Sequence, residues 1–244
     1  MGLTIHYKLR LSVTVTPAAA ERLVRAAYRR AADLVKSREL AEISPIMAQD
    51  RENPLGCQFV MEKRGEDTDG HDVKPEAGWM FSVHPGPGCE SAEFGLCLYP
   101  ATIRVGRRTL PTKCGGWGYA GFCKTQYASL HGPEHFLKCH RAVIDLLLIW
   151  ERLGVKVTIT DEGRYWPGRD EAKLLAEVGQ MNWLVAAFGG ALKDAADEGG
   201  PAVESPIFQH GQFELLEAQG LTQYGSRINQ GVEAVRRAGK MENT

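Results

Sequence analysis

Residues 115–129 read GGWGYAGFCKTQYAS, a run in which four glycines and four aromatic residues precede and flank a short polar segment. Glycine permits positive φ and close approach of the backbone, and residues 122–128 have the composition of a strand. We therefore expect the glycines to shape a tight turn and the aromatic rings to form an apolar wall. The strand that follows should lie at the centre of a sheet.

A helix and a second strand follow this central strand. Gly132 and Pro133 begin a strongly apolar segment of helical period that extends to about residue 153. Gly154 is a typical C-terminal helix residue, and residues 155–160 again alternate as a strand does. The pattern predicts a strand–helix–strand unit over residues 122–160.

The N-terminal part of the chain repeats this order. Residues 4–15 alternate between apolar and polar side chains, Thr16 is a typical N-cap, and Pro17 suits the first helical position. After a helix, residues 42–47 form a short apolar segment in which Pro45 indicates an edge strand. We expect both units to share one sheet, with both helices packed on the same face.

The intervening residues are more varied. Residues 79–84 and 93–99 read as a hairpin around the loop PGPGCES, because proline and glycine favour turns. Residues 50–77 turn polar around GEDTDGHD, and we expect a mobile exposed connection there in which only residues 58–62 resemble a strand.

The C-terminal part is predicted to be helical. Asp170 should cap a helix over residues 171–197, and residues 225–239 should form a short helix. The pattern as a whole predicts an α+β fold: a mostly antiparallel sheet with two ferredoxin-like strand–helix–strand units, helices on one face, and a C-terminal helical arm. We expect one domain over residues 1–198, and an arm over residues 199–244 that packs on the body or on a second subunit of a homo-oligomer.

Composition limits the classes of function. A net charge of −1 with 43% hydrophobic residues describes an ordinary globular chain and favours neither a membrane protein nor a bulk polyelectrolyte partner. The alternating N-terminus differs from a signal peptide, which predicts a cytoplasmic protein. The six cysteines are then expected to be reduced thiols.

Two features favour an interaction protein. The segment Gly118–Phe122 resembles the aromatic strand of the RNA recognition motif, which implies base stacking, although an extra glycine and Cys123 depart from that pattern. The first helix is basic, because residues 1–40 contain eight basic and three acidic side chains. Arg22, Arg25, Arg29 and Lys36 lie opposite its apolar stripe. The alternative for this basic helix is a solvated surface.

Metal binding and nucleophilic catalysis have few candidates. His135 and Cys139 are spaced so that one helix face would carry both, but buried free thiols are the alternative, and we expect no metal and no cofactor. Cys123 could act as a thiolate with His84 or His140 as its base, but no family signature surrounds these residues.

The predicted working site lies where residues 115–127 approach residues 161–166, with His84 nearby. Aromatic rings mixed with polar groups at strand ends suit a pocket for a small polar or aromatic ligand. The expected ligand-binding residues are His84, Trp117, Tyr119, Lys124, Gln126, Tyr127, Glu162 and Arg164. Whether a reaction is catalysed stays open. The alternatives are that the rings complete the core and that Asp161 and Glu162 pair with an arginine or cap a turn.

Overall fold

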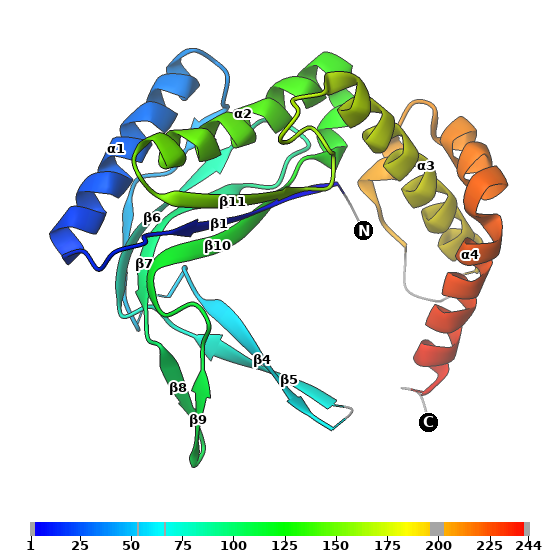
Figure 1. The fold of residues 1–244 in the computed structure, drawn as a ribbon. Helices are drawn as coiled ribbons and strands as arrows, with labels where there is room; N and C mark the ends of the chain where they lie inside the picture. The colour runs from blue at the N-terminus through cyan, green and yellow to red at the C-terminus, as the bar shows by residue number, and fades with distance from the viewer. Residues whose placement is uncertain (1–2, 53, 66, 196–202, 242–244) are drawn as a thin grey trace.

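The computed structural model describes residues 3–52, 54–65, 67–195 and 203–241. Its main element is a seven-stranded antiparallel sheet in the order β11-β1-β10-β7-β6-β2, with β3 also paired to β6 (Figure 1). The strands are β1 (Thr4–Arg10), β2 (Glu42–Ile43), β3 (Met47–Gln49), β6 (Ala77–His84), β7 (Ala92–Tyr99), β10 (Gly116–Lys124) and β11 (Lys156–Asp161). The predicted α+β class with a mostly antiparallel sheet is confirmed.

The two strand–helix–strand segments share this sheet, as the sequence predicts. β1 pairs with both β10 and β11, and the helices α1 (Pro17–Lys36) and α2 (Pro133–Arg152) cover the same face (Figure 1). The predicted N-cap of α1 is present, since Thr16 Oγ1 accepts a hydrogen bond from the backbone N–H of Ala19 at 3.3 Å.

The core lies between the sheet and these helices. Alternate residues of β1 point into it, and Ile5, Tyr7 and Leu9 are no more than 2% exposed. Phe81 is the centre of an aromatic cluster, because its ring contacts those of Phe94, Trp150 and Tyr28. Alternation along β1 therefore sends every second side chain to the core and leaves the others on the opposite face.

Two hairpins project from that opposite face: β4 (Gln58–Arg64) with β5 (Asp67–Val73), and β8 (Thr102–Val105) with β9 (Arg108–Pro111) (Figure 1). Within residues 50–77 the sequence predicts a strand only at residues 58–62; these residues lie in β4, but β5 was not predicted. Strand pairing satisfies the backbone groups whatever the side chains are, so a polar segment can still form a regular hairpin. A small apolar cluster fixes its base, where Val60 and Val73 pack with Met80 and Cys97.

The central strand differs from the prediction in its boundaries. β10 begins at Gly116 and ends at Lys124, and a 3₁₀ helix, η1 (Gln126–His131), follows where a strand was expected. Gly116, Gly118 and Gly121 lie within the strand and do not form the predicted tight turn, and Gly118 allows close packing of backbones. A Cβ atom at Gly118 would lie 2.6 Å from the carbonyl oxygen of Leu9. Within the run, the positive φ of 95° belongs to Gly116, at the start of the strand.

The remaining helices form a pair beside the sheet. α3 (Glu171–Ala195) begins after Asp170, whose Oδ1 accepts from the backbone N–H of Lys173 at 3.0 Å as predicted. It packs along α4 (Phe213–Met241), which η2 (Pro206–Gln209) precedes. α4 begins earlier than predicted, because its glycines do not break the helix. Instead they allow close packing on α3: a Cβ at Gly220 would lie 2.1 Å from the carbonyl oxygen of Trp183. None of the helices in the described ranges is both long and apolar enough to cross a bilayer.

Candidate functional site

The face of the sheet opposite α1 and α2 carries an ordered grid of side chains, which we call the open face. In antiparallel strands, directly paired residues share a face, so the strand register places β1 between matching rows of β10 and β11. The rows are Phe122–His6–Thr160, Ala120–Lys8–Thr158 and Gly118–Arg10–Lys156.

An exposed aromatic ring lies at one end of this grid. Phe122 is 55% exposed, although its neighbour Cys123 is fully buried. Two more large apolar side chains are exposed on β4, namely Phe59 and Met61 at 69% and 62%. Isolated exposed apolar residues are common, but here the ring stands among basic residues above the sheet.

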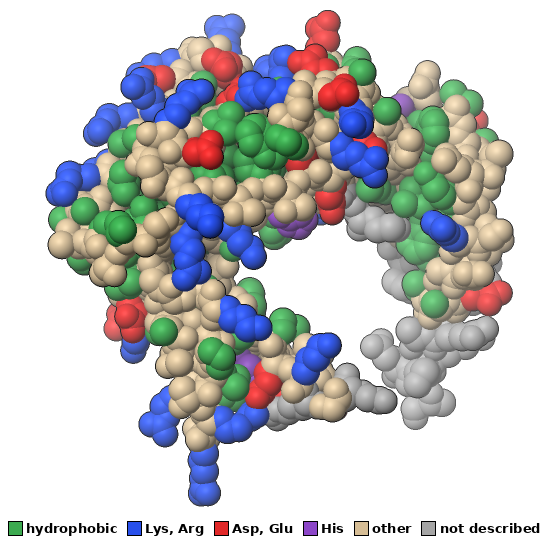
Figure 2. Space-filling view, viewed as in Figure 1, with side chains coloured by type: hydrophobic (Ala, Val, Ile, Leu, Met, Phe, Trp, Pro, Cys, Tyr) green, Lys and Arg blue, Asp and Glu red, His purple; other side chains and the backbone are tan. Residues whose placement is uncertain are grey.

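Two adjoining cavities follow the open face. One of about 310 Å³ lies over the His6 and Phe122 row, and one of about 360 Å³ extends toward β4, with Phe59 and Tyr119 in its lining. Lys8 and Ala120 line both cavities, so the two lie next to each other. Figure 2 shows the molecule hollowed beneath the sheet, with Lys and Arg side chains gathered on the sheet and hairpin side.

The open face is positively charged. In the part of the chain that the structure describes, Lys8, Lys113 and Lys156 form no ion pair. The Arg10 guanidinium donates to the carbonyl oxygens of Lys113 and Gly115, at 3.4 and 2.8 Å, and these neutral partners leave its charge uncompensated. A cleft of one sign attracts ligands of the opposite sign.

Glu162 and His6 form an accessible pair at the edge of this grid. The backbone N–H of Thr4 donates to Glu162 Oε2 at 2.9 Å, and the N–H of Glu162 donates to the carbonyl oxygen of Thr4 at 3.1 Å. These bonds hold Glu162 Oε1 at 3.7 Å from His6 Nε2, and the two side chains are 44% and 51% exposed. The His6 ring lies 6.1 Å from that of Phe122.

Asp161, the preceding residue, points the other way into a buried network. Its Oδ1 lies 3.2 Å from His140 Nε2, and His140 Nδ1 lies 2.9 Å from Thr125 Oγ1. Burial acts to raise the pKa of Asp161, but the hydrogen bond and charge of His140, with the N–H groups of Trp166 and Gly163, hold that pKa below its usual value. The order Thr–His–Asp resembles a nucleophilic triad, but Thr125 and His140 are fully buried, which makes the network structural. Asp161 caps a turn, as one alternative predicted.

A second buried network ties the helical pair to the sheet. Gln126 Oε1 accepts from the N–H of Leu3 at 3.2 Å, and Gln126 Nε2 donates to Asn182 Oδ1 at 3.0 Å. Asn182 Nδ2 in turn donates to Ser129 Oγ at 3.1 Å. The polar end of the run at residues 115–129 therefore anchors α3 to β1.

The structure separates the residues predicted for the pocket. Trp117 is 4% exposed and stacks on Trp79, and its Nε1 donates to the carbonyl oxygen of Val15 at 3.1 Å. It is therefore a core residue, and it lines none of the cavities that we find in the described ranges. Lys124 pairs with Glu90 at 2.9 Å. Trp117 was expected to wall a pocket because aromatic rings beside glycines resemble a cavity lining. Burial on the helix-covered side overrides that pattern.

The other predicted residues do not converge on one site. Tyr119 lines the cavity of about 360 Å³ and Glu162 lies at the edge of the open face, whereas Gln126 is buried in the anchoring network. The rest lie elsewhere: Tyr127 packs under α3, Arg164 pairs with Glu177 at 3.2 Å, and His84 lies on β6 opposite Glu42. The predicted ligand-binding residues do not include His6, Lys8, Arg10, Phe59 or Phe122, although Phe122 ends the segment that resembles the RNA recognition motif. The signal available for three of them was the basic alternate positions of β1.

Possible metal ligands come together in the described part of the chain. The predicted pair is adjacent, with Cys139 Sγ at 3.5 Å from His135 Nε2, but that nitrogen also lies 2.9 Å from the carbonyl oxygen of Pro87. Among described residues, three ligating groups lie within 4.8 Å of one another at Glu62, Asp69 and His71.

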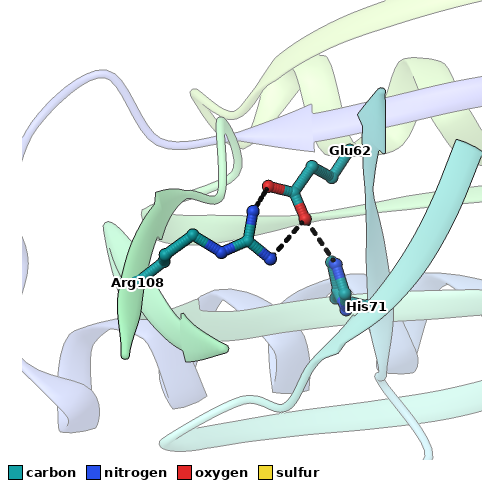
Figure 3. Close-up of polar contacts among 3 residues, drawn as sticks. All are labelled: Glu62, His71 and Arg108. Atoms are coloured by element: carbon teal, nitrogen blue, oxygen red, sulfur yellow. Dashed lines mark hydrogen bonds and ion pairs between the residues drawn. The ribbon is translucent and has the colours of Figure 1, made fainter. Parts of the chain in front are cut away.

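The carboxylate of Glu62 already has a cationic partner. The Arg108 guanidinium contacts both carboxylate oxygens of Glu62, and His71 Nε2 lies 3.2 Å from Oε2 (Figure 3). A cation would have to compete with that guanidinium for the same oxygens. Because Arg108 lies on β9 and the other two residues on β4 and β5, we interpret the cluster as a clasp between the hairpins.

Comparison with known proteins adds no relative: no protein-family model matches the chain, and neither a curated protein nor a solved structure matches it.

Proposed function

We propose that the open face binds single-stranded nucleic acid. The observation that carries this proposal is the half-exposed ring of Phe122, which stands beside His6 and Lys8 on a sheet face that none of the described helices covers. An exposed ring on such a face offers a stacking platform to any base, and neighbouring cations neutralise the phosphates. Both groups are needed for this ligand, and both occur on the same surface.

The spacing of the grid supports an extended ligand. Residues two apart along a strand are separated by about 7 Å, so Lys8 and Arg10 present charges in successive rows. Gly118 and Ala120 add little bulk beside them, which leaves the cavity open toward Phe59. We infer further that the two strand–helix–strand units are a ferredoxin-like pair, the type of platform that RNA recognition motifs use.

The first helix is a weaker candidate for the same role. Its arginine and lysine charges are partly compensated on the helix itself, since Arg25 pairs with Glu21 at 2.7 Å and Lys36 pairs with Asp33 at 2.9 Å. For a small polar or aromatic ligand, as expected from the sequence, the open face offers the cavity of about 360 Å³, which is within the size range of small-molecule sites.

Fluorescence anisotropy with labelled 15-nucleotide single strands and a matched duplex tests the proposal. We expect the single strands to bind more tightly than the duplex. Phe122→Ala should weaken binding about 5- to 150-fold, the equivalent of roughly 1–3 kcal/mol of stacking. Lys8→Ala should reduce the salt dependence by about 0.7 in the slope of log K against log salt.

Arg29→Ala, on the opposite side of the molecule, is the matched control and should bind as the unaltered protein does. Two results would contradict the proposal: a loss of binding in Arg29→Ala with none in Phe122→Ala, or a mononucleotide that binds as tightly as the 15-nucleotide strand. The second result would support the small-ligand alternative.

A further inference from the structure

The His6–Glu162 pair lies within the proposed binding surface and not beside it. His6 is in the same row as Phe122, and the next row carries Lys8, so a strand stacked on Phe122 would pass its sugar–phosphate backbone over the imidazole. Half of the His6 side chain is exposed, and apart from Glu162 it has no polar partner among the described residues.

Glu162 is held more firmly than an ordinary surface carboxylate. Its backbone N–H and its Oε2 both bond to Thr4, at 3.1 and 2.9 Å, so the carboxylate cannot rotate away without loss of a hydrogen bond to the adjacent strand. When an exposed ion pair forms, both side chains usually lose conformational entropy, which limits how much the pair stabilises the fold. Here one partner is already fixed, and its free oxygen is directed at His6.

We propose that this surface cleaves RNA, with His6 as the general base, Glu162 as its positioning residue and Lys8 as the group that stabilises charge on the phosphate. The inference rests on the proposed function, because the nucleic acid must first bind the open face. An accessible imidazole beside a fixed carboxylate is a common arrangement for proton transfer, and RNA supplies its own nucleophile in the 2′-hydroxyl.

The step balances without a further reactant. The 2′-oxygen attacks the adjacent phosphorus while His6 takes its proton, and the bond from phosphorus to the 5′-oxygen breaks. The departing oxygen takes a proton from water, and the proton on His6 returns to the solvent. The products are a 2′,3′-cyclic phosphate and a 5′-hydroxyl. Lys8 stabilises the charge that builds on the non-bridging oxygens, and Glu162 stabilises the imidazolium that forms.

The test uses the full chain and three labelled strands of one sequence: RNA, DNA and 2′-O-methyl RNA. We expect all three to bind, and only RNA to be cut, with a cyclic phosphate at the new 3′ end. His6→Ala should lower the cleavage rate about 100-fold or more, with binding retained, and added imidazole should restore part of it. Glu162→Gln should lower kcat with little change in KM, which a merely structural role would not do.

His6→Gln serves as a second variant should His6→Ala be unstable, and Arg29→Ala should cleave at the unaltered rate. Binding of all three strands with no cleavage of RNA overturns this inference and leaves the proposed function intact. Cleavage that persists in both His6 variants overturns it as well, because the activity then comes from another source. Absence of binding to any strand contradicts the proposed function itself.

Discussion

The two faces of the sheet use the same strands for opposite purposes. On the covered face, Ile5, Tyr7 and Leu9 are buried against α1 and α2, whereas His6 and Lys8 between them stay on the open face. Because side chains alternate along a strand, neighbouring residues fall under different constraints. The covered face should therefore determine stability, and the open face should tolerate change with little loss of fold.

The histidine–carboxylate pairs of Asp161 and Glu162 show the same contrast at closer range. Asp161 and Glu162 are adjacent in the chain, but Asp161 meets His140 with both side chains fully buried, while Glu162 meets His6 with both about half exposed. A buried pair cannot reach a ligand and serves as a brace. An accessible pair contributes little to stability and is available for proton transfer.

The largest expected effect is on the covered face. Phe81→Ala removes the ring at the centre of the aromatic cluster and should lower the free energy of unfolding by about 3–5 kcal/mol. Phe122→Ala, the same substitution on the open face, should change it by less than about 0.5 kcal/mol. Urea unfolding of both variants measures the difference. Equal losses would show that the open face is covered in the folded protein.

The buried pair should give the protein an acid-sensitive contribution to stability. Asp161→Asn is expected to lower the free energy of unfolding by about 1.5–3 kcal/mol at neutral pH, since it removes a charged acceptor of several hydrogen bonds. The folded pKa of Asp161 is lowered, so its contribution is complete above the unfolded pKa of about 3.9 and is lost as the pH falls through the folded value.

Urea midpoints of the unaltered protein and Asp161→Asn should therefore begin to converge below about pH 3.9 and meet once the pH is below the folded pKa of Asp161. Glu162→Gln is the matched control. At neutral pH its free energy of unfolding should lie within about 0.5 kcal/mol of that of the unaltered protein. A gap between the unaltered protein and Asp161→Asn that stays constant with acidification would contradict the origin we assign to it.

The anchoring network predicts a loss of intermediate size. Gln126→Leu leaves the N–H of Leu3 and the amide of Asn182 without their partner and should lower the free energy of unfolding by about 1–3 kcal/mol. Because α3 is attached through Asn182, hydrogen exchange should increase more in α3 than in α2. Uniform exchange across both helices would argue against a local anchor.

The smallest effect is expected at the clasp between the hairpins. Arg108 is 47% exposed, so Arg108→Ala should lower the free energy of unfolding by no more than about 1 kcal/mol. A double-mutant cycle with Glu62→Gln measures the coupling. If Glu62 instead served as a metal ligand, zinc or manganese would raise the melting temperature of the unaltered protein, and we expect no such shift because Arg108 occupies the Glu62 oxygens.

The sequence by itself determined the elements whose signals are local. Alternation predicted β1, helical period and caps predicted α1, α2 and α3, and the proline- and glycine-rich loop predicted the β6–β7 hairpin. Each signal depends on residues near one another in the chain, where intrinsic preference and capping act directly. That both strand–helix–strand units share one sheet also followed, because two apolar helix stripes each need a sheet face to cover.

Only the tertiary structure decided which residues face the solvent together. The polar β4–β5 hairpin forms through strand pairing and a small apolar cluster under it, neither of which is visible in local composition. Trp117 and Phe122 belong to the same aromatic run, yet one is buried and the other exposed, because they lie at odd and even positions of β10 and face opposite sides. The register of β1 between β10 and β11 then assembles the open face. A one-residue shift of that register would turn the basic side chains of β1 toward the core. The long-range pairing, rather than any motif, therefore creates the site.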